Sequence, residues 1–580
     1  MLASKSRFGW PLAVAGLVFI PLVVYPGWML ISLQGDGAGG VWTEWSTVLH
    51  SAALWRTVWF SLGLSLESTV FAVLIGVGVA VAIHRSPPGF ARWLVRSVEL
   101  MVAFPSFLIA FSLIFLYGSQ GSITAGVQHL LHLSGPPWDF LYGRAGVVFA
   151  EVCYYIPFMI RPTLAVLERM DPALPEAAAG LGARPGRVWR RVILPMAYPG
   201  ISAGAILCFL LIQNEFGILL VLGSQQVQTL PMLIYSTAMM NLDLPAASVT
   251  ATVMLGMSLA IYALYRQVER WSLGGRGGVF GGGAKGTGGS VGKSSGWAAW
   301  IATLAVVIVF VLPIMVVVVS ALARTWVGTV LPEGWTWRWF AVLDASDWAS
   351  LGVSIAVAGA VALLATVIGT GAALLLRRRR GGIAGLIDAL IMIPGAVPSV
   401  VVGLAVLAAY HQKPLDLSGS PAIVILVQLF LALPFSYRML LAIAETMPPA
   451  LEEAAAGLGA GPWRRIRRVQ IPLLLPGMRA SAALAFALSL GELGATMMVC
   501  PPGFATAPMQ ILQYIQRGYY YQGSALAVLL LLAGFLGLAA VAALGVNRRS
   551  GWALARKGLR RDRRAVDRGA GDGADIGAVS

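Results

Sequence analysis

The sequence predicts an all-α, polytopic membrane protein built from two parallel repeats of six helices each. Three observations carry this prediction: the composition, the distribution of basic residues and an internal duplication. Of the 580 residues, 58% are hydrophobic and only 11% are charged, and the mean hydropathy is +0.79. A soluble chain of this size would expose too much apolar surface to water. A lipid bilayer is therefore the predicted solvent.

Twelve apolar stretches are long enough to be membrane-spanning helices, which need roughly 20 mainly apolar residues. The first follows Lys5 and Arg7, and no small-residue cleavage site comes after it, so we expect an uncleaved span rather than a signal peptide. The fourth is the weakest because it contains Glu151, Pro157 and Arg161. The predicted spans are residues 10–33, 58–83, 98–117, 145–165, 199–222, 244–265, 297–323, 351–376, 385–410, 421–444, 479–500 and 522–546.

The basic residues gather on one side of these spans. If the N-terminus lies inside, the cytoplasmic segments hold 32 Lys and Arg residues and the outer segments hold 6. An excess of Lys and Arg is typical of the cytoplasmic side of membrane proteins. Both termini are therefore predicted to be cytoplasmic. The chain has a net charge of +16, but its basic residues are distributed as in a membrane protein, so we expect no nucleic-acid partner.

A glycine-rich stretch divides the chain into two halves. Residues 272–296 contain 12 glycines in 25 positions, which predicts a flexible cytoplasmic linker with a reach of roughly 25–30 Å. We therefore expect a first transmembrane domain at 1–271 and a second at 297–546. A basic tail at 547–580 would follow at the inner lipid surface.

The two halves repeat the same residues at a constant spacing. Ser61, Pro105 and Ser106 recur 293 positions later, and a longer loop at 118–144 than at 411–420 explains the change to a spacing of 277 further on. An even number of spans per half gives both copies the same orientation, with a central seam between them as the predicted pathway. The first-half residues that recur 277 positions later are Pro157, Phe158, Arg161, Pro172, Glu176, Ala177, Ala178, Leu181, Gly182, Ala183, Pro195, Pro199, Gly200, Glu215 and Gly217.

One cytoplasmic segment occurs in both halves. It reads PEAAAGLGARPGRVWRRVILP at 175–195 and LEEAAAGLGAGPWRRIRRVQIP at 451–472. An acid near a helix start complements the exposed N–H groups, and the alanines after it form a face with little bulk. The glycine then permits a sharp turn. We interpret the pair as docking elements for a cytoplasmic partner, with a solvated connecting loop as the alternative.

The order EAA, LGA and V-x-L-P resembles the cytoplasmic signature of permease subunits in binding-protein-dependent ABC importers. The second copy departs slightly, because Ile471 replaces the usual leucine before Pro472. The resemblance covers nearly the whole chain and implies that each segment docks into an ATP-hydrolysing subunit. The residues to which it assigns this coupling role are Glu176, Ala177, Ala178, Gly182, Glu453, Ala454, Ala455 and Gly459.

The same resemblance implies three partners: a cytoplasmic ABC ATPase dimer, an extracytoplasmic substrate-binding protein and the bilayer of the plasma or inner membrane. The chain itself lacks the G-x-x-x-x-G-K-[ST] loop that holds nucleotide phosphates. The stretch GGGAKGTGGS has the wrong spacing and lies in the linker. We therefore expect a translocation subunit rather than an enzyme, with no catalytic residues and no cofactor.

Polar residues inside predicted spans are candidates for the pathway, because charge in the bilayer is costly. Glu215 and Glu492 occupy equivalent places in the fifth span of each repeat, and Gln213 and Asn214 add to the first copy only. The alternative is a pair of buried carboxylates that are hydrogen-bonded within the bundle. Arg161 and its equivalent in the second half are expected to snorkel towards the inner surface.

Metal and disulfide sites are not predicted. His129 and His132 lie three residues apart in the long outer loop, but no third ligand is near in sequence, so we interpret them as solvent-facing. The cysteines, Cys153, Cys208 and Cys500, have no paired spacing.

The sequence is compatible with several transported solutes. The fused two-copy layout resembles permeases for ferric iron, 2-aminoethylphosphonate and thiamine, with the first two ranked nearly level and thiamine behind them. A secondary transporter that needs no ATP is the main rival interpretation. A membrane enzyme is a second rival, but no cluster of catalytic residues supports it.

Overall fold

The structure is a computed structural model of the chain, and it describes residues 20–35, 40–101, 104–171, 173–223, 227–274, 296–378, 382–411 and 415–543. The regular structure in these ranges is helical, apart from one isolated β-bridge between Ala323 and Trp335. Most of the predicted linker, at 275–295, the whole predicted basic tail and the start of the first predicted span lie outside the described residues.

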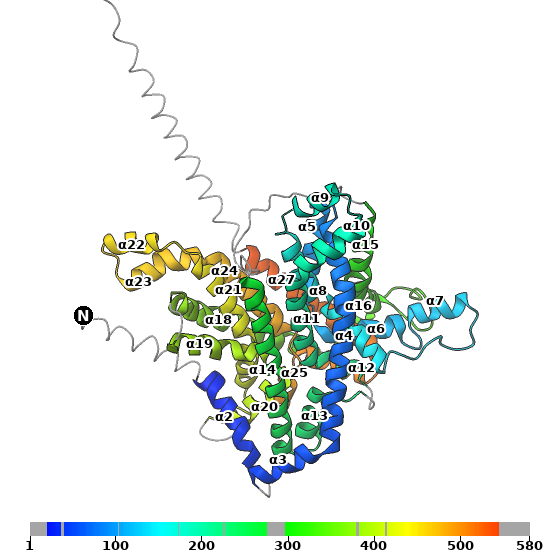
Figure 1. Cartoon of the computed structure of the whole chain (residues 1–580). Coiled ribbons are helices and arrows are strands. Elements are labelled where there is room, and N and C mark those ends of the chain that lie inside the picture. Colours follow the sequence, from blue (N-terminus) through cyan, green and yellow to red (C-terminus); the bar gives the residue numbers. More distant parts are fainter. Residues whose placement is uncertain are drawn as a thin grey trace, which may run out of the picture.

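From α4 and α18 onwards the helices of the two halves follow one another in the same order, apart from α7, which lies in the longer loop of the first half; this agreement confirms the duplication at the level of structure (Figure 1). Those of the first half are α2 (Tyr25–Ser32), α3 (Val41–His50), α4 (Ala52–His84), α5 (Pro88–Met101), α6 (Ser106–Tyr117), α7 (Ser122–Leu130), α8 (Arg144–Leu167), α9 (Ala173–Gly180), α10 (Pro185–Val188), α11 (Leu194–Gln213), α12 (Gly217–Leu222), α13 (Leu230–Tyr235) and α14 (Leu244–Gly274).

Those of the second half are α15 (Gly296–Val306), α16 (Leu312–Leu322), α17 (Arg338–Ala341), α18 (Ala345–Leu376), α19 (Gly382–Met392), α20 (Ser399–Tyr410), α21 (Ala422–Glu445), α22 (Pro449–Gly457), α23 (Pro462–Arg465), α24 (Ile471–Leu490), α25 (Gly494–Val499), α26 (Ala507–Gln516) and α27 (Tyr520–Ala543). The pairs α11 with α24 and α12 with α25 begin and end 277 residues apart, as the repeat predicts.

Nine helices in the described part of the chain are long and apolar enough to cross a membrane, and two bent helix pairs raise this number to eleven. The weak fourth span is present as α8. The third predicted span of each half is not one straight helix. In the second half, α20 is bent by 113° from the helix before it, and in the first half the stretch 98–117 is divided between α5 and α6.

Prolines explain these breaks. Pro105 and Pro398 stand directly before α6 and α20 in extended backbone conformations, with ψ of 133° and 140°. A proline has no N–H to donate and disfavours helical geometry in the residue before it. Hydropathy averaged over a window does not register such a break, so the sequence predicted continuous spans there.

The two halves share their cores. The short first helix α2 packs on α20 of the other half, and α16 packs on α6 in the reciprocal arrangement. One buried cluster therefore joins α6 and α8 to α16, α26 and α27, and a second joins α18, α20 and α21 to α2, α13 and α14. This exchange brings the breaks at Pro105 and Pro398 to the seam between the halves.

Candidate functional site

The two predicted coupling segments are helical hairpins that project from the bundle. Figure 1 shows α9 with α10, and α22 with α23, at two separate corners of the molecule, whereas α3 lies at the other end of α4 from α9. Glu176 and Ala177 are exposed and Ala178 is half-buried, and their equivalents Glu453, Ala454 and Ala455 repeat this pattern. The small-residue face is thus open to a partner in both halves.

Each hairpin turns at a glycine with the same backbone geometry. Gly182 has φ of +82°, and Gly459 has φ of +77°. In the first half, the N–H groups of Gly182 and Ala183 donate to the carbonyls of Ala179 and Ala178 at 2.9 and 3.1 Å. This hydrogen-bond pattern is the Schellman motif that ends many helices with a left-handed glycine.

The second half repeats the turn. The N–H groups of Gly459 and Ala460 donate to the carbonyls of Ala456 and Ala455 at 2.9 and 3.0 Å. A β-carbon placed on either turn glycine would meet no atom within 4 Å. The glycine is therefore required by the backbone conformation and not by lack of space.

Two leucines at these turns were not assigned a role from the sequence. Leu181 is 89% exposed and Leu458 is 88% exposed, and each directly precedes the turn glycine. The two leucines are thus exposed at equivalent positions of the two halves, and a contact with a partner there stays a prediction. The signal in the sequence was an apolar residue at the C-terminus of a short helix that is otherwise small and polar.

The hairpins are attached to the bundle in different ways. In the second half, the carboxylate of Glu452 on α22 forms ion pairs with Arg377 and, at 3.4 Å, with Arg378, both at the end of α18. The side chains of Arg377 and Glu452 are only 6% and 10% exposed. In the first half, buried Pro175 takes the place of Glu452, and His84 takes the place of Arg377.

A cation–π contact links the first hairpin to the end of α4. The guanidinium of Arg85 lies 6.0 Å from the ring centroid of Trp189, just after α10. A cation and the face of an aromatic ring attract each other, but this attraction is weaker than that between the two charges of a buried ion pair. The residue equivalent to Trp189 in the second half is Ile466.

The central seam forms where the fifth spans are broken. The gap between α24 and α25 packs on the other half: a β-carbon on Gly491 would lie 3.0 Å from Pro105. One on Gly494 would lie 2.5 Å from the hydroxyl of Ser399 and 3.2 Å from the ring of Phe216. Both breaks of the fifth spans and both prolines of the third spans thus meet in this region.

The predicted pathway carboxylates cap the short helices that follow these breaks. The N–H of Ile218 donates to Glu215 at 3.0 Å, and the N–H groups of Ala495 and Thr496 donate to Glu492 at 2.8 and 2.9 Å. Glu215 also accepts hydrogen bonds from Ser106, at 2.9 Å, and from Tyr155. Helix capping of this kind is observed for both carboxylates, and a pathway role stays a prediction.

The two amides beside Glu215 have different environments. Asn214 reaches the other half, because its amide donates to the carbonyl of Ala396 at 3.5 Å, and it accepts a bond from Ser258 at 3.1 Å. Gln213 is 2% exposed and accepts a bond from Ser65 at 2.9 Å. Asn214 therefore lies at the seam, whereas Gln213 is buried against α4 of its own half.

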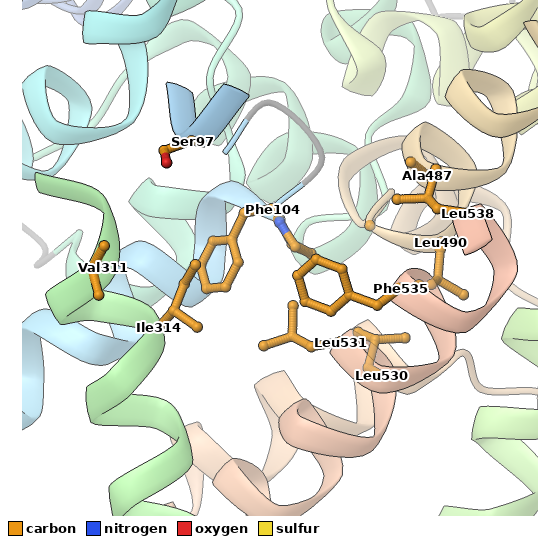
Figure 2. Close-up of a pocket in the computed structure, with 13 residues that line it drawn as sticks. Ser97, Phe104, Val311, Ile314, Ala487, Leu490, Leu530, Leu531, Phe535 and Leu538 are labelled. Carbon is orange, nitrogen blue, oxygen red and sulfur yellow. The ribbon is translucent and has the colours of Figure 1, made fainter. Parts of the chain in front are cut away.

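An apolar crevice of about 170 Å³ opens beside the seam. It lies between the break that precedes α6 and the helices α16, α24 and α27 of the other half, and Figure 2 shows the rings of Phe104 and Phe535 within it. Ser97 is the one lining residue with a polar side chain. Such a lining offers nothing to hold a polar solute, so the pathway candidates remain the polar residues of the seam.

No group of three or more His, Cys, Asp or Glu side chains that is arranged to hold a metal ion occurs among the residues that the structure describes. His129 lies in the last turn of α7, and His132 follows in the loop with φ of +50°.

Both halves of the chain match the same family of known proteins. Residues 72–273 and 365–549 both match the family model described as the binding-protein-dependent transport system inner membrane component. Together the matches cover more than half of the chain.

Two similar relatives and one solved structure each match less than half of this chain. The protein named 2-aminoethylphosphonate transport system permease protein PhnU, from Salmonella typhimurium, is 34% identical over 252 residues, or 43% of this chain and 88% of that protein. The permease protein PhnV of the 2-aminoethylphosphonate transport system, from the same organism, is 37% identical over 216 residues, or 37% of this chain and 81% of that protein. A solved bacterial alginate ABC transporter, in complex with an alginate pentasaccharide-bound periplasmic protein, is 17% identical with a TM-score of 0.40, covering 46% of this chain and 96% of that chain.

Proposed function

Because the chain belongs to the family of binding-protein-dependent transport system inner membrane components, we propose that it forms the membrane pathway of an ABC importer for 2-aminoethylphosphonate. The observation that carries the choice of solute is the similarity to PhnU and PhnV, at 34% and 37% identity. Ferric iron and thiamine, which the layout of the sequence also suggests, have no such support from these relatives.

The coupling role of the two hairpins is part of this proposal. Separate ATPase subunits would bind the exposed faces that begin at Glu176 and Glu453, together with the leucines at the tips. When the ATPases close on ATP, the hairpins would move with them, and the long helices that follow would carry the movement to the seam. The shared turn at Gly182 and Gly459 supports equivalent docking in both halves.

Glu215, Glu492, Gln213 and Asn214 would line the seam through which the solute passes. Their support is their place at the breaks of the fifth spans, where Asn214 contacts the other half. A solute-binding protein on the outer side would deliver the solute to this seam. ATP hydrolysis would be performed by the partner subunits, and this chain would perform no catalysis.

The proposal is tested by uptake into proteoliposomes. The purified chain is reconstituted with its ATPase and binding protein, and labelled 2-aminoethylphosphonate, Fe³⁺ or thiamine is supplied outside. We expect uptake of 2-aminoethylphosphonate that requires ATP and the binding protein. Uptake of only Fe³⁺ or thiamine would reject the solute, and uptake without ATP would favour the secondary transporter that the sequence left open.

A further inference from the structure

A buried carboxylate in the first half has one oxygen without a partner. Glu151 on α8 is 1% exposed, and the hydroxyl of Ser68 on α4 donates to its Oε2 at 2.6 Å. Its Oε1 is buried and receives no hydrogen bond. An unpaired acceptor on an acidic side chain is costly within a membrane bundle, where no bulk water can solvate it. The capping contacts described above do not account for this residue.

A buried amide with a free donor lies on α11, which packs against α8 and α4. Gln213 on α11 accepts a bond from Ser65 of α4 at 2.9 Å, whereas its Nε2 has no partner. Ser65 and Ser68 are three residues apart on one helix, so their β-carbons lie roughly 5–6 Å apart on the same face. The free acceptor and the free donor are therefore held on adjacent turns where α4, α8 and α11 pack together.

A second carboxylate extends the cluster. Tyr155 lies one helical turn after Glu151 on α8, and its hydroxyl donates to Glu215. Neither Glu151 nor Glu215 forms an ion pair within the part of the chain that the structure describes. Buried acidic groups are normally paired with a cation, so the chemistry that would complete this cluster is a positive charge that carries hydrogen-bond donors.

The second half shows that the fold does not need this arrangement. Gln428 stands at the place of Glu151, and both of its amide atoms are hydrogen-bonded: Nε2 donates to Thr496, and Oε1 accepts from Ser489. The apolar replacements in the second half are Ala358 for Ser65, Val361 for Ser68, Ala432 for Tyr155 and Leu490 for Gln213. A duplicate that packs without the cluster indicates that the first half keeps it for a ligand.

We propose that Glu151 and Gln213 form an occluded subsite for a primary ammonium group of the transported solute. The ammonium donates to the free Oε1 of Glu151, and the amide of Gln213 donates to an acidic oxygen of the same zwitterion. The subsite becomes accessible when α4, α8 and α11 separate during transport. This inference rests on the proposed function, because 2-aminoethylphosphonate supplies the ammonium group.

The test compares two solutes that differ in the amino group. Binding of 2-aminoethylphosphonate and of ethylphosphonate is measured on the purified permease–ATPase complex without the binding protein, whose own selectivity is thereby excluded. Glu151→Gln keeps the shape and copies the residue at position 428. We expect the wild type to prefer the amino compound by about tenfold or more, as a charged hydrogen bond implies, and Glu151→Gln to bind both compounds equally weakly.

Two controls make the outcomes distinct. Glu67→Gln removes a partly exposed carboxylate that pairs with Arg144 at 2.8 Å, and it should leave the preference unchanged. The subsite is overturned, while the transport function stands, by either of two results. The wild type could import 2-aminoethylphosphonate but show no preference for the amino compound in binding, or the Glu151→Gln variant could keep that preference. Failure of the wild type to import 2-aminoethylphosphonate with all partners present rejects the proposed solute itself, and the subsite with it.

Discussion

The two predicted coupling hairpins have the same tip, at Leu181–Gly182 and Leu458–Gly459, but different roots, where each hairpin contacts the bundle. At the tip, both place an exposed leucine before a left-handed glycine, with the same pair of backbone hydrogen bonds. At the root, α22 is tied to α18 through a buried ion pair of Glu452 with Arg377, whereas the first half has Pro175 at the place of Glu452 and a cation–π contact of Arg85 with Trp189.

This difference shows which part of the duplicated unit tolerates change. The tip is the surface that we propose binds the ATPases, and its backbone geometry is retained in both copies. The ion pairs and the cation–π contact at the roots are made within this chain, so they can differ as long as the helix stays in place. We infer that the second hairpin is held more rigidly than the first, and that the two respond unequally to the same movement of the ATPases.

The largest effect is expected from Glu452→Ala. The substitution leaves Arg377 as a buried charge without its partner, and breaking such a pair costs about 3–5 kcal/mol. We expect amide hydrogen exchange in α22 to rise by about a hundredfold or more, since local opening follows local stability. Coupled uptake should fall with it.

Two variants sharpen this prediction. Glu453→Ala removes the same charge from the neighbouring exposed position and should change exchange in α22 by less than about twofold. Replacing both partners, with Glu452→Leu and Arg377→Met, should restore most of the protection because an apolar pair leaves no buried charge. Unchanged exchange in Glu452→Ala would show that the ion pair does not hold the hairpin.

A smaller effect is expected from valine at the turn glycines. A residue with a β-carbon costs roughly 1–2 kcal/mol in the left-handed region. Gly182→Val and Gly459→Val should therefore weaken ATPase co-purification and ATP-driven uptake, with insertion unaffected. Asparagine tolerates this conformation, so the matched Gly182→Asn and Gly459→Asn variants should keep most of the activity.

The relative size of these two losses tests the comparison of the roots. The first hairpin has the weaker attachment, so Gly182→Val should cost more uptake than Gly459→Val. Equal losses would indicate that the attachments do not matter for coupling. Valine variants that bind the ATPase and import normally would count against docking at the tips altogether.

Much of the fold follows from local features of the sequence. The constant spacing of 277 predicted that α11 and α24 have the same limits, and Gly182 predicted a sharp turn from its place in a small-residue segment. The packing of α2 on α20 and the pairing of Arg377 with Glu452 join distant parts of the chain. No periodicity or spacing encodes such contacts, because each depends on how complete helices pack.

Some residues of the candidate site could be predicted from the sequence, and others could not. Glu215 and Glu492 were found because they recur in both halves within apolar spans, and the structure adds that both cap a helix. Glu151 was read only as a weakness of its span, because its equivalent is a glutamine and the repeat therefore did not mark it. Reasoning from duplication finds what both copies share and overlooks what one copy alone contains.

The smallest effect is expected from Trp189→Leu, which removes the ring that Arg85 faces at 6.0 Å. A cation–π contact at a site open to water is worth about 0.5–1 kcal/mol, so exchange in α9 and α10 should rise by only about twofold to fivefold. Ile466→Leu, at the equivalent position of the second half, is the matched control and should change nothing measurable. If Trp189→Leu loosened the first hairpin as strongly as Glu452→Ala loosens the second, the two roots would be equally firm, and unequal coupling would lose its basis.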